Sequence, residues 1–169
     1  MEKESNLLKN EKDLKVVVDY IKGNFDNTIK NILKELWFLS TKVAEVHWPI
    51  HKELIVVDNV FKEFSFIIEN HLDKKEKYFF PMISDRNIQN NNLEILDFIE
   101  KSKKINNNFL LNLEKLRNLT DNYKIPEGAC KTYTKLLTNL LELDQILIRY
   151  IDIENKIFFP LILSKLESL

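Results

Sequence analysis

Apolar residues recur along most of the chain at the three- and four-residue spacing of a helix that buries one face. Four long segments carry this pattern, at about residues 25–47, 51–80, 93–119 and from 126 onward, and a short segment at about 12–22 precedes them. A helix of about 25–30 residues is about 40 Å long, and short connections between such helices favour antiparallel neighbours. The pattern therefore predicts an all-α fold, an antiparallel up-down four-helix bundle with a short N-terminal helix.

The predicted breaks between helices coincide with residues that interrupt helices. They are Gly23-Asn24, Trp48-Pro49-Ile50, Pro81 with the polar run 87–92, and Lys124-Ile125-Pro126. We expect Pro126 at or just before the first turn of the fourth long helix, where proline is well tolerated. Residues 1–24 would then be an N-terminal extension, and residues 25–169 the bundle, of a single domain.

Composition supports long helices and narrows the classes of function. The 169 residues include two glycines and four prolines, which is too few for a fold rich in turns. The net charge of −1 gives no electrostatic reason to expect nucleic acid or an anionic membrane as a partner. No apolar run approaches the ~20 residues of a membrane span, and the single cysteine cannot form an internal disulfide. We therefore expect a cytoplasmic protein, as a monomer or a homodimer.

The second and fourth long segments contain an internal repeat. Residues 71–83 (HLDKKEKYFFPMI) align without gaps on residues 150–162 (YIDIENKIFFPLI). Identical pairs are Asp73/Asp152, Lys77/Lys156, Phe79/Phe158, Phe80/Phe159, Pro81/Pro160 and Ile83/Ile162. The repeat predicts that the two helices are quasi-equivalent and end in the same way, so that the bundle can hold a site whose ligands come in matched pairs.

The two copies that end in Phe-Phe-Pro resemble the helix motifs of hemerythrin-like proteins, in which a histidine is followed four residues later by a glutamate and then by Phe-Pro. Residues 18–21 (VDYI), 41–47 (TKVAEVH) and 126–130 (PEGAC) further resemble the di-iron proteins associated with repair of iron centres under nitrosative stress. The resemblance covers nearly the whole chain. It implies a bundle core in which four histidines and two bridging glutamates bind two irons.

Carried over residue by residue, this resemblance implies a metal site that is largely lost. His71 and Glu154 keep the ligand types of their positions. Lys75 stands where the second bridging glutamate is expected, and Tyr150 and Asp26 stand at histidine positions. The third long helix offers Ser102 or Asn106 on its inner face, with Lys104 aligned by count alone.

Helical register places His71, Lys75 and Tyr78 on one inner face, and Tyr150 with Glu154 on the facing one. Lys75 and Glu154 should therefore meet inside the bundle, where each charge is costly unless paired. We expect a buried ion pair that supplies the positive charge of the lost metal, with Asp26 and Tyr150 completing a hydrogen-bond network and no cofactor. The alternative is one iron or another divalent metal held by Asp26, His71, Tyr150 and Glu154, against which the Lys75 ammonium counts.

Three functions remain open at this point. The first is a non-enzymatic interaction or regulatory role with an unknown protein partner, in the stress response or iron metabolism that the resemblance implies. The second is a metal-binding protein for iron delivery or for sensing nitric oxide or oxygen. The third is an enzyme that uses Tyr150, Lys75 and Glu154 as acid–base groups, although the balance leans against an enzyme.

Two histidines and the cysteine lie away from this site. If the first long helix is continuous, the 21 residues from Asp26 to His47 correspond to about 31 Å along its axis, which puts His47 at the opposite end. Pro49 separates His47 from His51, so we interpret both as helix-end histidines, with a small external metal site as the alternative. Cys130 at the start of the fourth helix is interpreted as a structural or neutral thiol rather than an activated one.

Overall fold

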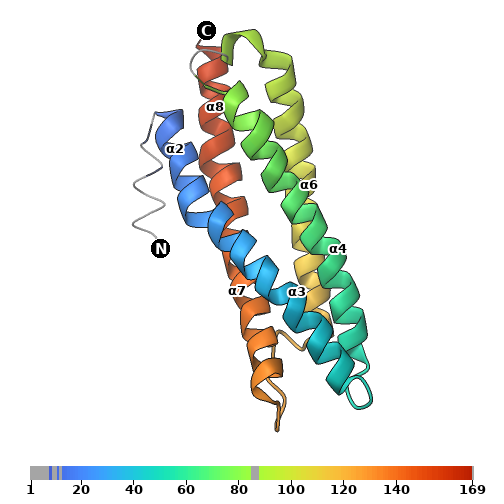
Figure 1. The fold of residues 1–169 in the computed structure, drawn as a ribbon. Coiled ribbons are helices and arrows are strands. Elements are labelled where there is room, and N and C mark those ends of the chain that lie inside the picture. The colour runs from blue at the N-terminus through green and yellow to red at the C-terminus, as the bar shows by residue number, and fades with distance from the viewer. Residues whose placement is uncertain (1–7, 9–10, 12, 85–87, 169) are drawn as a thin grey trace.

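Four long helical rods stand side by side in the computed structural model, which describes residues 8, 11, 13–84 and 88–168 (Figure 1). The α-helices are α2 (Leu14–Ile21), α3 (Asn27–His47), α4 (Glu53–Lys74), α5 (Phe80–Met82), α6 (Asn92–Leu119), α7 (Lys131–Ile153) and α8 (Phe159–Glu167). Three π-helical turns, η1 (Lys22–Asp26), η2 (Lys75–Phe79) and η4 (Glu154–Phe158), join these helices within the described residues, and η3 (Ile88–Asn90) is a 3₁₀ turn. In chain order the four rods are α2–η1–α3, α4–η2–α5, α6 and α7–η4–α8. The all-α bundle predicted from the sequence is confirmed.

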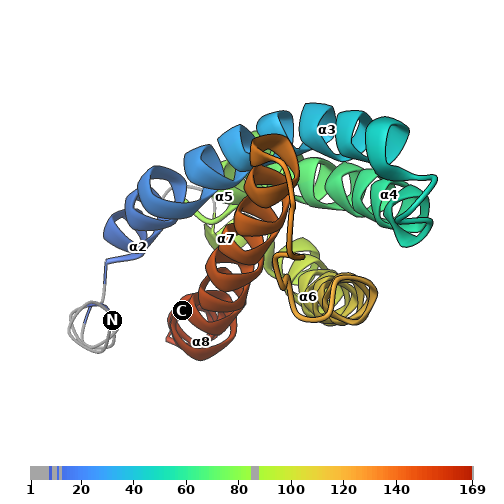
Figure 2. The same cartoon turned by 90° about the horizontal axis from the view of Figure 1, so that it is seen from below.

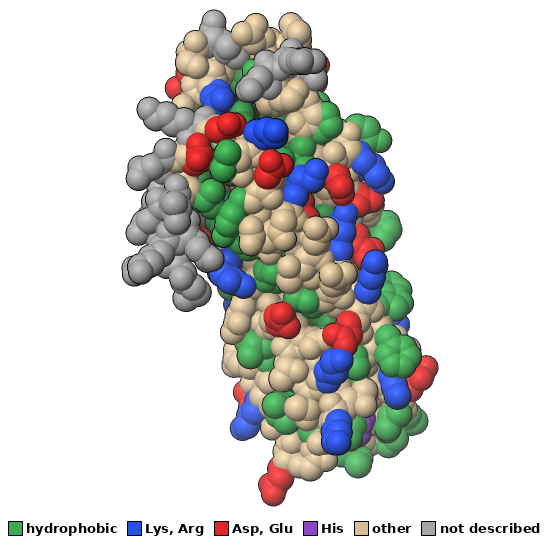
Figure 3. All heavy atoms as spheres, turned by 60° about the vertical axis from the view of Figure 1, so that its left-hand side comes forward, with side chains coloured by type: hydrophobic (Ala, Val, Ile, Leu, Met, Phe, Trp, Pro, Cys, Tyr) green, Lys and Arg blue, Asp and Glu red, His purple; other side chains and the backbone are tan. Residues whose placement is uncertain are grey.

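The four rods pack around a continuous apolar core. α3 packs against α4 and α7, α4 also packs against α6, and α6 lies across the bundle from α3 (Figure 2). On the face shown in Figure 3 acidic and basic side chains are intermixed, as a mixed charge composition leads one to expect. Within the described ranges, every helix is too short or too polar for a bilayer span.

The predicted break at Gly23-Asn24 is wrong, because η1 joins α2 directly to α3 (Figure 1). In this π-turn the backbone N–H of Asn27 donates to the carbonyl of Lys22, five residues back, so the helix absorbs one extra residue without breaking. The predicted first residue of the short helix, Lys12, lies outside the described residues. α2 itself begins at Leu14, where the Asp13 side chain accepts the N–H of Lys15.

The prediction that the repeated helices end in the same way is also wrong. The Phe-Phe-Pro segment of the second rod lies at its end, whereas that of the fourth rod lies inside it, and each proline is in the first turn of the α-helix that follows a π-turn. Proline is tolerated there because that turn needs no N–H from it. The second rod stops at Met82, but the fourth continues through α8, where Ile162, Leu163 and Leu166 keep an apolar face on the core.

The fourth rod begins later than predicted, at Lys131 rather than near Pro126. The loop before it contains three successive residues with left-handed backbone, Asp121, Asn122 and Tyr123, at φ of 48°, 58° and 62°. Such conformations cost of order 1 kcal/mol or more each for residues other than glycine. The loop therefore needs contacts that hold it in this shape.

Asp144 of α7 supplies those contacts. Its buried carboxylate accepts a hydrogen bond of 2.6 Å from the Tyr123 hydroxyl and two more of 2.6 Å from the Arg117 guanidinium. The carboxylate thus joins the end of α6, the left-handed loop and the middle of α7. Asp144 acts as a structural clamp on the connection between the third and fourth rods.

Replacing Asp144 with asparagine is expected to lower the free energy of unfolding by about 2 kcal/mol, because the charge that accepts the Arg117 and Tyr123 bonds is lost. Urea denaturation at pH 7 measures the change. Asp97→Asn is the matched control, since Asp97 is exposed and bonds only a lysine one turn away on α6, a contact worth about 0.5 kcal/mol. Equal losses in the two variants would show that Asp144 is not a clamp.

Candidate polar core site

Five polar residues predicted for the core site are all buried inside the bundle. They come from η1, α4, η2, α7 and η4 and have exposed fractions of 5% or less: Asp26, His71, Lys75, Tyr150 and Glu154. The site lies where the three π-turns interrupt the rods. Asp26 is the last residue of η1, and Lys75 and Glu154 are the first residues of η2 and η4. Rare π-turns of this kind are frequent at functional sites.

The π-turn also corrects one predicted position. Tyr78, expected on the inner face, is 64% exposed, whereas Phe79 is fully buried. The extra residue in η2 turns the helix so that the inward position after Lys75 falls four residues later rather than three. The same turn in η4 follows Glu154, so the two copies of the repeat carry equivalent charged residues at equivalent places.

A buried ion pair joins the two copies. The Lys75 ammonium donates to Glu154 Oε1, and both side chains are 0% exposed. The same ammonium donates to the Tyr150 hydroxyl at 2.6 Å. Aromatic rings enclose it, with the centroids of Tyr150, Phe80 and Phe158 at 4.5, 5.2 and 5.6 Å from Nζ. Ring faces and an opposite charge offset part of the large cost of burying an ammonium.

The third rod contributes Asn106 to this site. Its side-chain amide donates to Glu154 Oε2 at 2.8 Å, so that each carboxylate oxygen has a donor. Ser102 is also buried, but its hydroxyl has no hydrogen-bond partner. Lys104 lies outside the core, where it pairs with Glu100 on the surface. Of the residues that the sequence left open, Asn106 is the one that contacts Glu154.

The electrostatics of the site keep Glu154 ionised and Tyr150 neutral. Burial alone would raise the pKa of Glu154, yet the charge and hydrogen bond of Lys75 outweigh it and hold this pKa below its usual value. Burial, with the nearby carboxylates of Glu154 and Asp26, raises the pKa of the Tyr150 phenol well above its ordinary value. Tyr150 therefore accepts the Lys75 hydrogen bond as a neutral phenol.

Asp26 and His71 lie beside the ion pair without completing its hydrogen bonds. Asp26 Oδ1 and His71 Nε2 are buried and have no hydrogen-bond partner in the protein. The expected network therefore closes through Asn106, and not through this oxygen of Asp26. Burial raises the pKa of Asp26 to about 6, and burial lowers the pKa of His71 to about 4.

These two shifts oppose each other in the pH dependence of stability. The lowered pKa of His71 costs stability as the pH falls from 6.5 to about 4, because the unfolded chain then binds the proton more tightly. The raised pKa of Asp26 adds stability as the pH falls from about 6 to 3.8, because the folded chain binds that proton more tightly. Each effect is worth about 3 kcal/mol, so we expect their sum to be small.

Single variants should separate the two effects. Asp26→Asn leaves only the histidine, so this variant should lose about 3 kcal/mol between pH 6.5 and 4 relative to the wild-type profile. His71→Gln leaves only the aspartate and should gain a similar amount over nearly the same range. Urea denaturation at several pH values measures both slopes. Parallel profiles for the three proteins would contradict the assignment.

The donor set is poor for a metal ion. Within residues 13–84 and 88–168 no three His, Cys, Asp or Glu side chains are grouped so that they could hold one. The positive charge of Lys75 acts on both Asp26 and His71, so a cation bound by these two residues would be repelled.

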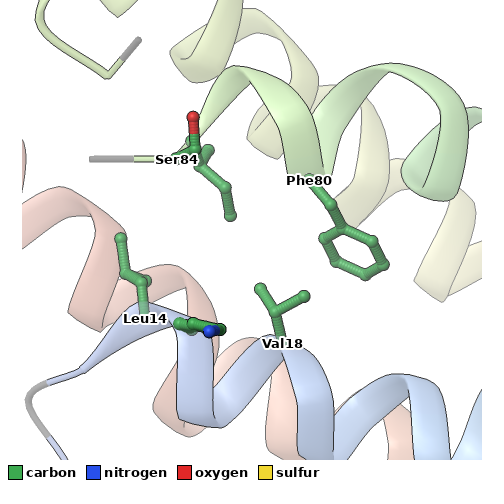
Figure 4. A pocket seen from close by; sticks show the side chains of 6 residues that line it. Leu14, Val18, Phe80 and Ser84 are labelled. Atoms are coloured by element: carbon green, nitrogen blue, oxygen red, sulfur yellow. The ribbon is translucent and has the colours of Figure 1, made fainter. Parts of the chain in front are cut away.

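Neither of two surface pockets opens onto the ion pair. One, of about 170 Å³, lies between α2 and α5 and is lined by Leu14, Lys15, Val18, Phe80, Ile83 and Ser84 (Figure 4). The other, of about 520 Å³, lies between α3 and α4 and includes Trp48 and Ile55. Phe80 belongs both to the first pocket and to the aromatic cage of Lys75, so its ring is buried between them. Lys75 and Glu154 are thus shielded from both pockets.

The two remaining histidines lie at the other end of the bundle, as predicted. α3 ends at His47 and α4 begins at Glu53, so His47 and His51 share no continuous helix, although the His51 N–H donates to the His47 carbonyl at 2.8 Å. One contact there was not predicted: His47 Nε2 lies 3.2 Å from Cys130 Sγ. Local sequence patterns do not reveal a pair separated by 83 residues.

Comparison with known proteins gives consistent matches. The model of the hemerythrin HHE cation binding domain matches residues 27–162. The iron-sulfur cluster repair protein ScdA of Staphylococcus epidermidis is 28% identical over 162 residues, which cover 92% of this chain and 70% of that protein. DnrN of Neisseria gonorrhoeae, also named an iron-sulfur cluster repair protein, is 27% identical over 87% of this chain and 90% of its own length. YtfE of Yersinia pseudotuberculosis, of the same description, is 27% identical over 85% of this chain and 63% of its own length.

Proposed function

The chain belongs to the hemerythrin HHE cation binding domain family, and from that premise we propose that it works without a di-iron centre, as an interaction or regulatory protein in iron–sulfur cluster maintenance. The observation that carries this proposal is the buried Lys75–Glu154 pair at equivalent positions of the internal repeat. The ammonium lies between the repeats and neutralises Glu154 from inside the protein. A metal ion bridging two carboxylates would serve the same electrostatic purpose.

The residues of the core do not fit two iron ions. The site has one imidazole, His71, and one of its two repeat-related charged residues is a cation. A bound iron would supply redox and Lewis-acid chemistry, but Lys75 would repel the metal and already holds the Glu154 carboxylate. No step of the proposed function is therefore assigned to a di-iron pair.

The closed core supports a role outside enzyme catalysis. Lys75, Tyr150 and Glu154 are fully buried, and the rings of Phe80 and Phe158 cover the ammonium. A substrate would have to displace this cage to reach an acid–base group. Relatives of the chain are named for iron–sulfur cluster repair, and we propose that the chain acts in that process. We propose that its outer surface binds a protein partner there.

Complementation tests this proposal. In cells that lack the protein, recovery of an iron–sulfur dehydratase after exposure to nitric oxide should slow and should be restored by the wild-type chain. His71→Gln, which removes the one core imidazole, should restore it equally well if no metal is needed. Failure of a folded His71→Gln variant would overturn the metal-free mechanism, and normal recovery without the protein would overturn the setting.

One observation favours a second candidate function. Asp26 Oδ1 and His71 Nε2 are buried atoms of metal-binding types without hydrogen-bond partners. Together with Tyr150 and Glu154 they are the side chains that would have to move closer together to bind a single metal ion, and such a site would act in iron delivery or in sensing nitric oxide or oxygen. Anaerobic titration with ferrous iron distinguishes this candidate. Saturable binding of one iron per chain that His71→Gln abolishes would favour it over the metal-free protein.

A further inference from the structure

A thiol–imidazole contact lies at the end of the bundle opposite the ion pair. α3 ends at His47 and α7 begins after Cys130, and the two helices are antiparallel neighbours. His47 Nε2 and Cys130 Sγ are 3.2 Å apart, within hydrogen-bond distance. The cysteine is exposed to solvent, so a small molecule can reach the sulfur.

Neighbouring groups fix this contact. The backbone N–H of Tyr133 points at Cys130 Sγ at 3.4 Å, which makes the sulfur the N-cap of α7. The buried Tyr133 ring packs against the His47 ring, with centroids 5.3 Å apart. His51 packs against the same ring, with centroids 5.4 Å apart, but its Nδ1 bonds Glu53, and the hydrogen bond to the sulfur is made by His47. His47 is therefore the base held beside the thiol.

The thiol and the imidazole lie at neighbouring ends of two helices. His47 is the last residue of α3, where the helix dipole stabilises a positive charge. Cys130 caps the first turn of the 23-residue α7, where the dipole and the Tyr133 N–H stabilise a negative charge. The C-terminal end of α3 and the N-terminal end of α7 are neighbours because the helices run antiparallel. A nucleophile with a base in reach is the arrangement that activates a thiol.

We propose that Cys130 and His47 form a nucleophilic pair that reacts with low-molecular-weight disulfides. The Cys130 thiol gives its proton to His47 Nε2, and Sγ attacks one sulfur of the disulfide. A new S–S bond forms to Cys130, the original S–S bond breaks, and the departing thiolate takes the proton from His47. Cys130 is oxidised to a mixed disulfide, and half of the small disulfide is reduced to a thiol.

The composition of the chain makes this modification persistent. Cys130 is the one cysteine of the 169 residues, so no second thiol within these residues can displace the attached group. Release requires an external thiol. Attachment also removes the hydrogen of the thiol and crowds the His47 contact at the start of α7. The mixed disulfide on Cys130 is thus a reversible surface modification that records contact of the protein with small disulfides, and it is independent of the polar core.

The rate of reaction with 2,2′-dithiodipyridine tests the proposal. With the full chain at pH 7, the release of pyridine-2-thione measures the reaction of Cys130, the one cysteine of the sequence. His47→Gln should react at least about tenfold more slowly, since a general base typically contributes about a hundredfold or more. His51→Gln is the matched control, because His51 packs against the same Tyr133 ring but bonds Glu53, and its rate should stay within about twofold of wild type.

Two further measurements keep the test decisive. Far-UV circular dichroism of both variants should match the wild type, so that a slower rate does not reflect unfolding. Mass spectrometry after incubation with glutathione disulfide should show one glutathionyl group on the wild type and a smaller fraction on His47→Gln at equal times. A folded His47→Gln variant with a rate within about twofold of wild type would overturn the pair as a nucleophilic site.

Discussion

Replacing Lys75 with alanine is expected to lower the free energy of unfolding by about 3–5 kcal/mol, because the change leaves Glu154 charged and buried without its partner. The Tyr150 hydroxyl also loses the hydrogen bond of 2.6 Å that it accepts from Lys75. Only Asn106 remains as a donor to the carboxylate. Urea denaturation at pH 7 and 25 °C measures the loss.

Two further variants show whether the loss of stability comes from the unpaired buried charge. Lys104→Ala, which removes an exposed lysine one turn from Glu100, should cost about 0.5 kcal/mol or less. The double variant Lys75→Met with Glu154→Gln removes both charges of the ion pair and keeps an acceptor for Asn106. It should therefore be more stable than the Lys75→Ala variant. A double variant that loses as much stability as the Lys75→Met and Glu154→Gln single variants together would show that the charges do not compensate each other.

Replacing Lys75 with glutamate is expected to make the stability of the protein depend on divalent metal. The change puts a second carboxylate beside Glu154 at the repeat-related position, so the metal-free variant should lose at least as much stability as Lys75→Ala. Added Mn²⁺ or Fe²⁺ should restore part of it. A metal present at a hundred times its dissociation constant adds about 2.7 kcal/mol. Thermal unfolding with and without metal measures the difference.

Matched variants separate metal binding at this site from binding elsewhere. Lys75→Gln removes the charge but adds no carboxylate, so its unfolding temperature should not respond to metal. Adding Glu154→Gln to the Lys75→Glu variant should abolish the response, because one carboxylate is lost again. Adding Tyr150→His should strengthen it by supplying a second imidazole. A wild-type protein that responds to metal as strongly as Lys75→Glu would contradict the proposal that Lys75 takes the place of the metal.

The sequence was sufficient for the bundle and for the partners of the ion pair. Helical periodicity identifies the four rods, since each buries one apolar face against the same core. The internal repeat placed Lys75 and Glu154 at equivalent positions, and the side chains meet there. Both results follow from patterns that repeat along the chain.

Other features depend on interactions that the sequence pattern does not contain. A π-turn shifts the backbone hydrogen bonds by one residue, which the 3.6-residue period cannot show, and so Tyr78 was expected inside where Phe79 lies. The Asp144 clamp binds Tyr123 and Arg117, which lie 21 and 27 positions before it in the sequence, and a loop with left-handed backbone lies between. Its partners become apparent only once the third and fourth rods are placed side by side.

The metal content of the wild-type protein, purified without chelators from cells grown in iron-replete medium, tests the central claim most directly. Elemental analysis together with an optical spectrum suffices. A core closed by Lys75 and Glu154 predicts iron, zinc and manganese far below one ion per chain and no absorption from an oxo-bridged di-iron or iron–tyrosinate centre. Stoichiometric metal that His71→Gln removes would contradict it.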